Sequence, residues 1–243
     1  NDSGAVSRGN DGPKGSIYTA NYRTAKATGQ YIMKGAKEGE TYRPNFTFFG
    51  FRYVEITADK DINLIDFKAE FVSSDMTETG FVETSSDDVN KLISNVFWGQ
   101  RCNYLSVPTD CPQRDERLGW TGDTQIFVGT GAYNADVRGF FHKWMRDMRD
   151  CQCEKGSYTC VAPVGPYGKS RMRFGWADAG VITPWVIWKQ YGDTQIIDES
   201  WASMELFVDY INSTKYDHNA HREENHDKQY SDWLSYEPLE TYS

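Results

Sequence analysis

Short apolar runs with partial alternation fill the chain from residue 16 to about residue 73. Tyrosine, phenylalanine and β-branched residues dominate these runs, and clusters of Gly, Asp and Asn separate them. A period of two is typical of strands that bury one face. We therefore predict an antiparallel β-sandwich, or a portion of one, from the runs 17–22, 31–33, 45–49, 51–56 and 67–72.

The pattern changes to helical spacing after Thr84. Ser86 and Asp87 offer an N-cap, and five apolar residues then repeat every three or four positions up to Arg101. An irregular stretch from Val107 to Gly122 contains two prolines and two glycines, and it predicts a structured loop. Further helices are expected at about 123–132, 135–150, 180–191 and 194–213, with breaks at Gly175 and Gly192.

The chain is therefore expected to be an α+β multidomain protein with three parts. Residues 1–15, rich in Gly, Ser, Asn and Asp, predict a flexible arm, 16–84 the β-sandwich portion, and 85–243 an all-α region. About five helices are few for a closed bundle of this helix length. We expect apolar helix faces to be left uncovered, so that the chain pairs with itself as a homo-oligomer or aggregates.

Composition excludes some classes of partner and permits others. A formal net charge of -9, without a basic stripe, disfavours nucleic acid, and no apolar run is long enough for a membrane span. The 8 Trp and 15 Tyr permit a carbohydrate site, because rings offer a flat apolar surface to sugar C–H groups. Most of these aromatic residues are expected to fill the core instead.

The sequence gives little indication of a metal site or of disulfide bonds. The 5 cysteines are an odd number without a paired C-x-x-C spacing, so we interpret them as mainly reduced thiols. His218, His221 and His226 do not match a common metal-ligand spacing, and the acidic loop lacks the alternating ligands of a calcium loop. We expect neither a metal nor another cofactor. No signal peptide is visible at the N-terminus, and the compartment stays open.

The loop from Val107 to Asp123 carries the densest chemistry. It holds four carboxylates, two arginines and a tryptophan. Glycoside cleavage needs one carboxyl that stays protonated for the leaving oxygen, and clustered carboxylates raise one another's proton affinity. The alternative is an ion-paired linker, and Arg117 in particular is expected to have a structural role.

The segment Leu105–Asp123, LSVPTDCPQRDERLGWTGD, closely resembles the signature of glycoside hydrolase family 78, the bacterial α-L-rhamnosidases. Segments that agree with it in order are 48–55, 74–80, 98–100, 175–178, 184–185, 191–193 and 231–234. The resemblance covers nearly everything from residue 40 onward. It implies the end of a β-sandwich domain followed by the first part of an (α/α)6 catalytic barrel.

The resemblance also implies roles for individual residues. Glu116 matches the general acid of an inverting hydrolase of terminal α-L-rhamnosides. The positions that match residues binding the rhamnose hydroxyls or lining the pocket are Asp110, Arg114, Asp123, Trp120, Trp176 and Trp233. Asp115 is assigned no catalytic role. Ala177 and Ser231 stand where the family pattern has glycine.

The second carboxylate of the reaction is missing from the matched motifs. The resemblance implies a general base beyond the end of this chain, and Glu237 and Glu240 do not lie in that motif. This chain alone is therefore expected to be inactive. The substrate class is a rhamnose-containing glycoside or polysaccharide, and the alternative is a catalytically incomplete fragment that binds rhamnose.

Overall fold

The computed structural model describes residues 15–63, 66–165 and 175–213. They fall into two compact units that do not follow chain order. The first unit contains the residues up to Ser73 together with Cys111–Arg117, and the second contains Ser74–Asp110 and the residues from Leu118 onward. The acidic loop expected within the helical region therefore belongs partly to the N-terminal unit. The predicted arm, except for Gly15, lies outside the described residues.

The first unit is less regular than the sequence suggests. Among its described residues there is one 3-10 helix, η1 (Ala20–Tyr22), and no strand, so the structure does not confirm a β-sandwich. The strand expected over 17–22 is wrong where η1 forms. There the amide of Tyr22 donates to the carbonyl of Thr19 at 3.0 Å. Asn21 favours such a turn because its short polar side chain competes with strand hydrogen bonding.

Glu40 organises one turn of this unit. Its carboxylate accepts hydrogen bonds from the hydroxyl of Tyr31 at 2.5 Å and from the amides of Lys34 at 2.9 Å and Ala36 at 3.0 Å. These bonds, the Tyr31 bond most of all, lower the pKa of Glu40 to about 2. The ring of Tyr31 also stacks on that of Tyr42, with centroids 4.7 Å apart. The hydrogen bonds to Glu40 and the stacking of the two tyrosine rings together hold this turn.

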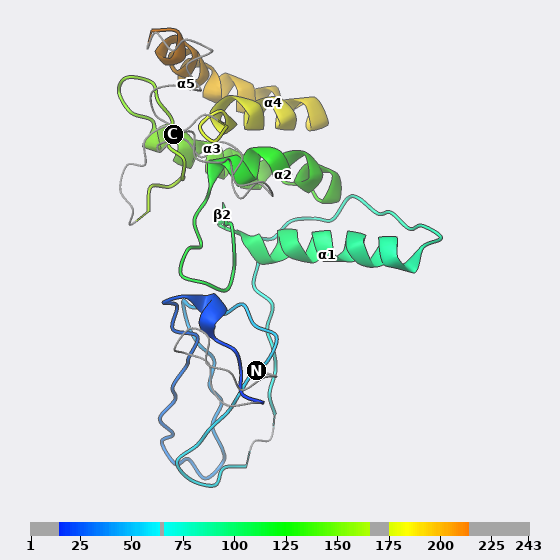
Figure 1. The fold of residues 1–243 in the computed structure, drawn as a ribbon, viewed down its shortest axis with the longest axis vertical. Coiled ribbons are helices and arrows are strands. Elements are labelled where there is room, and N and C mark those ends of the chain that lie inside the picture. Colours follow the sequence, from blue (N-terminus) through cyan, green and yellow to red (C-terminus); the bar gives the residue numbers. More distant parts are fainter. Residues whose placement is uncertain (1–14, 64–65, 166–174, 214–243) are drawn as a thin grey trace, which may run out of the picture. The chain divides into compact units, whose positions relative to one another are not determined.

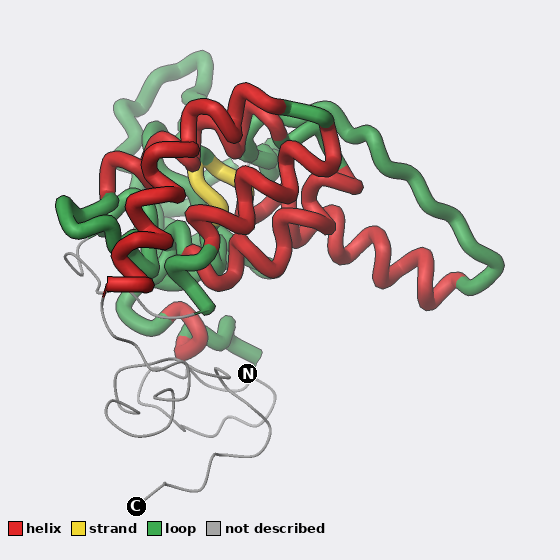
Figure 2. Tube along the Cα trace, turned by 90° about the horizontal axis from the view of Figure 1, so that it is seen from above, coloured by secondary structure: helices red, strands yellow, loops and turns green. Residues whose placement is uncertain are grey.

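The second unit is helical, as predicted (Figure 1). A short antiparallel pair, β1 (Tyr104–Leu105) and β2 (Val107–Pro108), follows the first helix. Helices α2 to α5 pack against one another, whereas the N-terminal end of α1 projects beyond them in both ribbon and tube views (Figures 1 and 2). The helices are α1 (Asp87–Asn103), α2 (Thr121–Asn134), α3 (Arg138–Cys151), α4 (Ala179–Tyr191) and α5 (Thr194–Ser213).

Local signals in the sequence explain two of the helix ends. Ser86 is the N-cap of α1, but its side chain makes no capping bond. Thr84 and Asn90 make the stabilising contacts instead, since the amide of Thr84 donates to Oδ1 of Asn90 at 2.8 Å and Nδ2 of Asn90 donates back at 2.9 Å. Gly192 ends α4 in the left-handed region at φ 69°, where glycine has no Cβ penalty.

The core of this unit is built on α3. Phe141, Trp144, Met145 and Met148 of this helix are fully buried. Phe141 contacts the rings of Tyr104 and Trp144 edge to face, with centroids 5.9 Å and 6.1 Å apart. The helices around α3 add further buried side chains to the same cluster, namely Val128, Ile187, Ile196 and Phe207. This core fixes the helices that carry the site described below.

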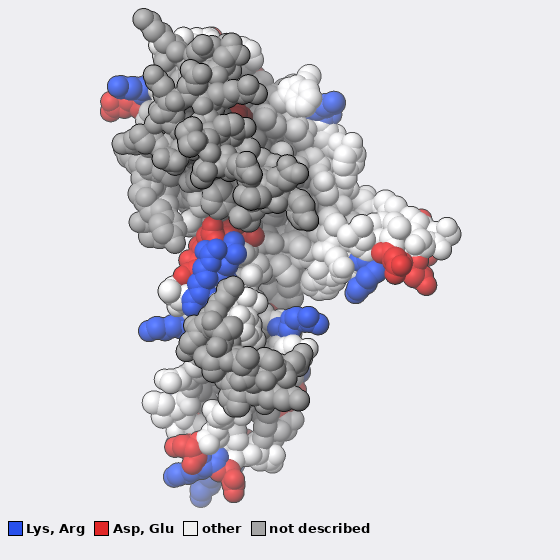
Figure 3. All heavy atoms as spheres, in the orientation of Figure 1, with Lys and Arg blue, Asp and Glu red and all other residues white. Residues whose placement is uncertain are grey.

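Part of the helical surface is apolar. Leu92 of α1, Trp185 and Trp188 of α4 and Trp201 of α5 are all more than two-fifths exposed. Among the described residues, no helix combines the length and the apolar content needed to cross a lipid bilayer. On the face drawn in Figure 3, the acidic and basic side chains that are visible lie interspersed, without an extended patch of one sign.

Candidate active site

The acidic loop is closed at its base by Asp110 and Leu118. The amide of Asp110 donates to the carbonyl of Leu118 at 3.2 Å, and the amide of Leu118 donates to Oδ1 of Asp110 at 3.0 Å. One carboxylate oxygen of Asp110 therefore holds the loop closed. Both residues belong to the second unit.

Glu116 lies in the tip of the loop, in the first unit, and binds two guanidinium groups. Its Oε2 is 2.9 Å from Nη2 of Arg114 and 3.1 Å from Nη1 of Arg23. The side chain of Glu116 is only 18% exposed, against 54% for Arg23. The structure thus brings together two of the predicted site residues, Arg114 and Glu116. It adds the guanidinium group of Arg23, which the motif did not indicate.

The neighbours of Glu116 have separate partners. Asp115 accepts hydrogen bonds from the hydroxyl and the amide of Thr24, and the hydroxyl bond most of all lowers the pKa of this carboxyl. Arg117 lies over the ring of Phe48 at 4.5 Å and donates to the carbonyl of Phe48 at 3.3 Å. Arg117 therefore has a structural role within its unit. It contacts an aromatic ring and a backbone carbonyl, whereas the sequence analysis considered ion pairing.

The start of α2 is held by the segment 159–162. The amide and hydroxyl of Thr121 donate to the carbonyl of Cys160 at 2.9 Å and 3.0 Å, and the amide of Ala162 donates to the carbonyl of Gly119 at 2.9 Å. Trp120 is the N-cap residue, and Asp123 lies in the first turn. A carboxylate there interacts favourably with the positive end of the helix dipole. These contacts fix both predicted site residues on a rigid helix end.

Trp176 packs against the same turn of α2. A Cβ at Gly122 would lie 2.6 Å from Cε2 and Nε1 of the Trp176 indole, so the two residues touch without room for a methyl group. The amide of Gly175 donates to Oδ2 of Asp178 at 2.7 Å, which shapes the turn before α4. Trp120, Asp123 and Trp176 are therefore gathered around one helix terminus.

Replacing Gly122 by Ala tests this contact. We expect a loss of about 1–3 kcal/mol in the free energy of unfolding, because the Trp176 indole must move to admit the methyl group. Urea denaturation followed by circular dichroism measures it. Gly129→Ala is the matched control on the same helix, since a Cβ there meets nothing within 4 Å. The control should gain about 0.5–1 kcal/mol, and equal effects at both positions would contradict the packing of Trp176 on Gly122.

The described residues leave part of the predicted site untested and add two residues to it. Trp233 lies outside the described residues, as do Glu237, Glu240 and the three C-terminal histidines. Arg23 and Thr24, which bind Glu116 and Asp115, were not predicted to belong to the site. They are more than ninety residues away in the chain from their partners, and no local pattern indicates the contact.

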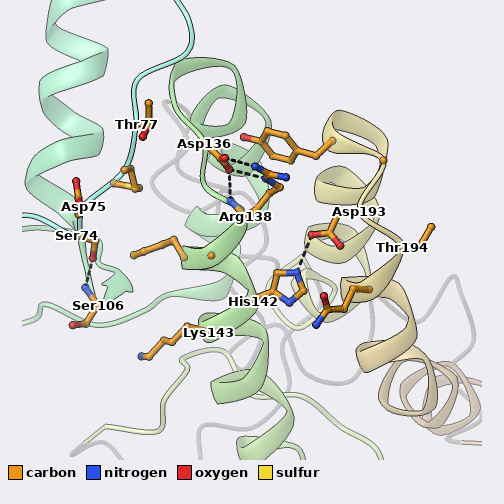
Figure 4. Close-up of a pocket in the computed structure, with 16 residues that line it drawn as sticks. Ser74, Asp75, Thr77, Ser106, Asp136, Arg138, His142, Lys143, Asp193 and Thr194 are labelled. Carbon is orange, nitrogen blue, oxygen red and sulfur yellow. Dashed lines mark hydrogen bonds and ion pairs between the residues drawn. The ribbon is translucent and has the colours of Figure 1, made fainter.

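A pocket of about 870 Å³ lies at the other end of α2, within the second unit (Figure 4). Several of its charged groups pair with one another or with neighbouring side chains. Arg138 binds Asp136 at 2.5 Å, and Nε2 of His142 lies 2.8 Å from Oδ2 of Asp193. Burial raises the pKa of Asp193, but the bonds from His142 and the amide of Ile196 outweigh it, so the net pKa is lowered. The His142–Asp193 pair ties α3 to the turn between α4 and α5.

The family models and the sequence relatives that match this chain agree with one another. Residues 77–242 match the family described as the bacterial alpha-L-rhamnosidase 6 hairpin glycosidase domain, and residues 10–73 match the bacterial alpha-L-rhamnosidase concanavalin-like domain. The α-L-rhamnosidase of Streptomyces avermitilis is 46% identical over 82% of this chain, and one from Formosa agariphila is 39% identical over 91%.

A solved structure is also similar. The crystal structure of the Streptomyces avermitilis α-L-rhamnosidase complexed with L-rhamnose matches with a TM-score of 0.74 and 42% identity, covering 82% of this chain and 19% of that one. The chain spans 19% and 24% of the length of the two relatives named above.

Proposed function

This chain belongs to the bacterial α-L-rhamnosidase family, and we propose on that premise that it supplies the proton donor and part of the sugar pocket for hydrolysis of terminal α-L-rhamnosides. The observation that carries the proposal is the environment of Glu116. It is a largely buried carboxylate at the tip of an acidic loop, bound by Arg114 and Arg23. In this proposal Glu116 protonates the leaving oxygen as the glycosidic bond breaks.

The sugar is held by the other residues of the motif. Asp110, Arg114 and Asp123 offer carboxylate acceptors and guanidinium donors to the rhamnose hydroxyls. Trp120 and Trp176 offer apolar ring faces to its C–H groups and methyl group. The rigid first turn of α2, which carries Asp123 and contacts Trp176, supports this role because a preorganised site binds with less loss of entropy. Trp233 has the same proposed role from outside the described residues.

The proposed mechanism is inverting. Such a reaction needs a second carboxylate, about 6.5–9.5 Å from the acid, that activates water on the opposite face of the sugar. In this proposal the base is a carboxylate that is not among the motif residues named above. We also propose that the chain consists of a β-sandwich portion followed by the first part of an (α/α)6 barrel. The concanavalin-like and six-hairpin family matches support it.

A second candidate is a fragment that binds rhamnose without cleaving it. The small share of the relatives' length that this chain spans favours this alternative for the chain taken alone. The exposed tryptophans of α4 and α5, including Trp185 and Trp201, support self-association of such a fragment, because uncovered apolar faces associate in water.

The experiment that tests the proposal combines calorimetric titration of the chain with L-rhamnose and a hydrolysis assay on an aryl α-L-rhamnoside. The same assay is run on the full-length protein. We expect rhamnose binding by both and turnover by the full-length protein alone. Turnover by the chain would show that one of its own carboxylates acts as the base. A full-length protein that neither binds rhamnose nor cleaves the glycoside would refute the assignment.

A further inference from the structure

The pocket beyond the C-terminal end of α2 is separate from the proposed sugar site. Its volume of about 870 Å³ lies within the range of about 300–1,000 Å³ that is common for small-molecule sites. Every residue that lines it belongs to the second unit. Because α2 has 14 residues, its two ends are about 20 Å apart. A ligand in this pocket therefore does not share the site around Asp123.

One wall of the pocket is the linker that precedes α1. The amide of Ser74 donates to the carbonyl of Tyr104 at 2.8 Å, and Oγ of Ser74 accepts from the amide of Ser106 at 2.9 Å. Further along the linker, the carbonyl of Thr77 accepts from the amide of Asp136 at 2.8 Å. The linker is thus fixed to the helical unit at both ends of the wall.

The opposite wall is the turn between α4 and α5. His142 of α3 binds Asp193 at 2.8 Å, and the hydroxyl of Tyr191 donates to the carbonyl of Ala135 at 2.8 Å. Figure 4 shows the linker residues on one side of the start of α3 and Asp193 and Thr194 on the other. Both walls are held by the fold, and a preformed site binds a ligand with less loss of entropy.

The charges in the pocket disfavour an anionic ligand. Nε and Nη2 of Arg138 bind the two carboxylate oxygens of Asp136 at 2.9 Å and 2.5 Å, and Nζ of Lys143 binds Asp147 at 2.6 Å. Helix N-termini attract anions, but Asp136 and Asp193 already occupy the starts of α3 and α5. A ligand without net charge fits this arrangement better.

The remaining polar groups suit a ligand rich in hydroxyl groups. Among the described residues, the carboxylate of Asp75 and the hydroxyls of Thr77, Ser106 and Thr194 have no hydrogen-bonding partner. A carboxylate only accepts hydrogen bonds, whereas a hydroxyl both donates and accepts. Sugar hydroxyls likewise do both, so they can pair with each of these groups.

We propose that this pocket is a second, non-catalytic binding site for a neutral saccharide. The site goes beyond the proposed function and is independent of the role of Glu116. Only the choice of L-rhamnose as a probe rests on the proposed function.

Gly139 allows the pocket to be filled without disturbing its walls. It lies in the first turn of α3 and lines the pocket, and a Cβ there would meet nothing within 4 Å. Gly139→Leu should therefore place a side chain in the open space and weaken saccharide binding by at least about tenfold. Gly99→Leu is the matched control, because Gly99 is an exposed helical glycine of α1 whose Cβ would also meet nothing.

Asp75→Ala is a second variant that leaves the shape of the pocket unchanged. Asp75 is exposed, so the substitution should have little effect on folding. It removes the carboxylate acceptor, and we expect binding to weaken by about three- to tenfold.

The test is NMR titration of the full-length protein labelled in its methionine methyl groups. Met76 lines the pocket and packs against the core, so its methyl signal reports this site, and Met76→Leu identifies that signal. The probes are L-rhamnose, D-galactose as a second neutral sugar, and D-glucuronate as an anion. We expect a saturable shift with a neutral sugar that persists in Gly99→Leu and is weakened in Gly139→Leu and Asp75→Ala.

The alternative results are distinct. The absence of a saturable Met76 shift with either neutral sugar would overturn the proposal, as would equal binding by Gly139→Leu and Gly99→Leu. Tighter binding of D-glucuronate than of the neutral sugars would refute the ligand class.

Hydrolysis of an aryl α-L-rhamnoside, measured on the same proteins, separates this proposal from the proposed function. We expect kcat and KM to stay within about twofold in Gly139→Leu, because the two sites lie at opposite ends of α2. If the full-length protein does not cleave the rhamnoside, the proposed function fails while Met76 still reports the pocket. If it cleaves the rhamnoside and Met76 does not respond, the proposed function stands and the second site is refuted.

Discussion

Replacing Glu116 by Gln in the full-length protein is expected to lower kcat/KM for a rhamnoside with an alkyl aglycone by about 10²–10⁴-fold. Gln keeps the size and much of the hydrogen bonding of Glu116 but has no acidic proton for the departing alkoxide. An aryl rhamnoside with an acidic phenol should lose far less, because its leaving group departs without protonation. The dependence of the loss on the leaving group is the property to measure, by comparing steady-state rates on the two substrates.

The control for this variant is Glu205→Gln, at an exposed position of α5 far along the chain from the acidic loop. It should leave both rates within about twofold, since exposed surface substitutions change stability little. If Glu116→Gln loses the same factor on both substrates, the variant has damaged binding or folding, and the role of proton donor is wrong.

The largest effect on stability is expected from Phe141→Ala in the core of the helical unit. Phe141 is fully buried and contacts Tyr104, Phe140 and Trp144, so its truncation leaves a cavity lined by rings that cannot close over it. We expect a loss of about 3–5 kcal/mol in the free energy of unfolding. Because a typical domain has only about 5–15 kcal/mol in total, this loss is a large part of the whole stability and should lower the midpoint of unfolding clearly.

Phe81→Ala provides the matched comparison, because Phe81 is 79% exposed in the same unit. The same chemical change there should cost less than about 0.5 kcal/mol. Urea unfolding followed by circular dichroism and by tryptophan fluorescence gives both values. Similar midpoints for the two variants would mean that Phe141 is not at the centre of the core.

The helical half of the fold follows closely from sequence pattern. All five predicted helices form, and their ends differ from the expected positions by a few residues. The reason is physical, since spacing such as that of Val89, Leu92 and Ile93 reflects one face of a helix, and Gly192 marks a helix end by backbone geometry. The loop between Pro108 and Trp120 was likewise expected from its prolines and glycines.

The N-terminal unit was less predictable. Alternation suggested strands that the described residues do not contain, because short aromatic runs fit several backbone conformations until distant contacts select one. The pairing of Arg23 with Glu116 and of Arg117 with Phe48 could not be read from the sequence either. Each joins residues far apart in the chain, and no periodicity encodes such contacts. The motif predicted which residues form the loop, but not what holds its tip.

The excursion of Cys111–Arg117 into the N-terminal unit has a consequence for how this gene can be cut and recombined. An exchange of the N-terminal module at residue 84, where the sequence suggests a boundary, would leave Glu116 without Arg23 and Arg117 without Phe48. A chimaera made at this boundary carries every motif residue of the loop but lacks the surface that binds its tip. A transplant therefore has to include both partners of each contact.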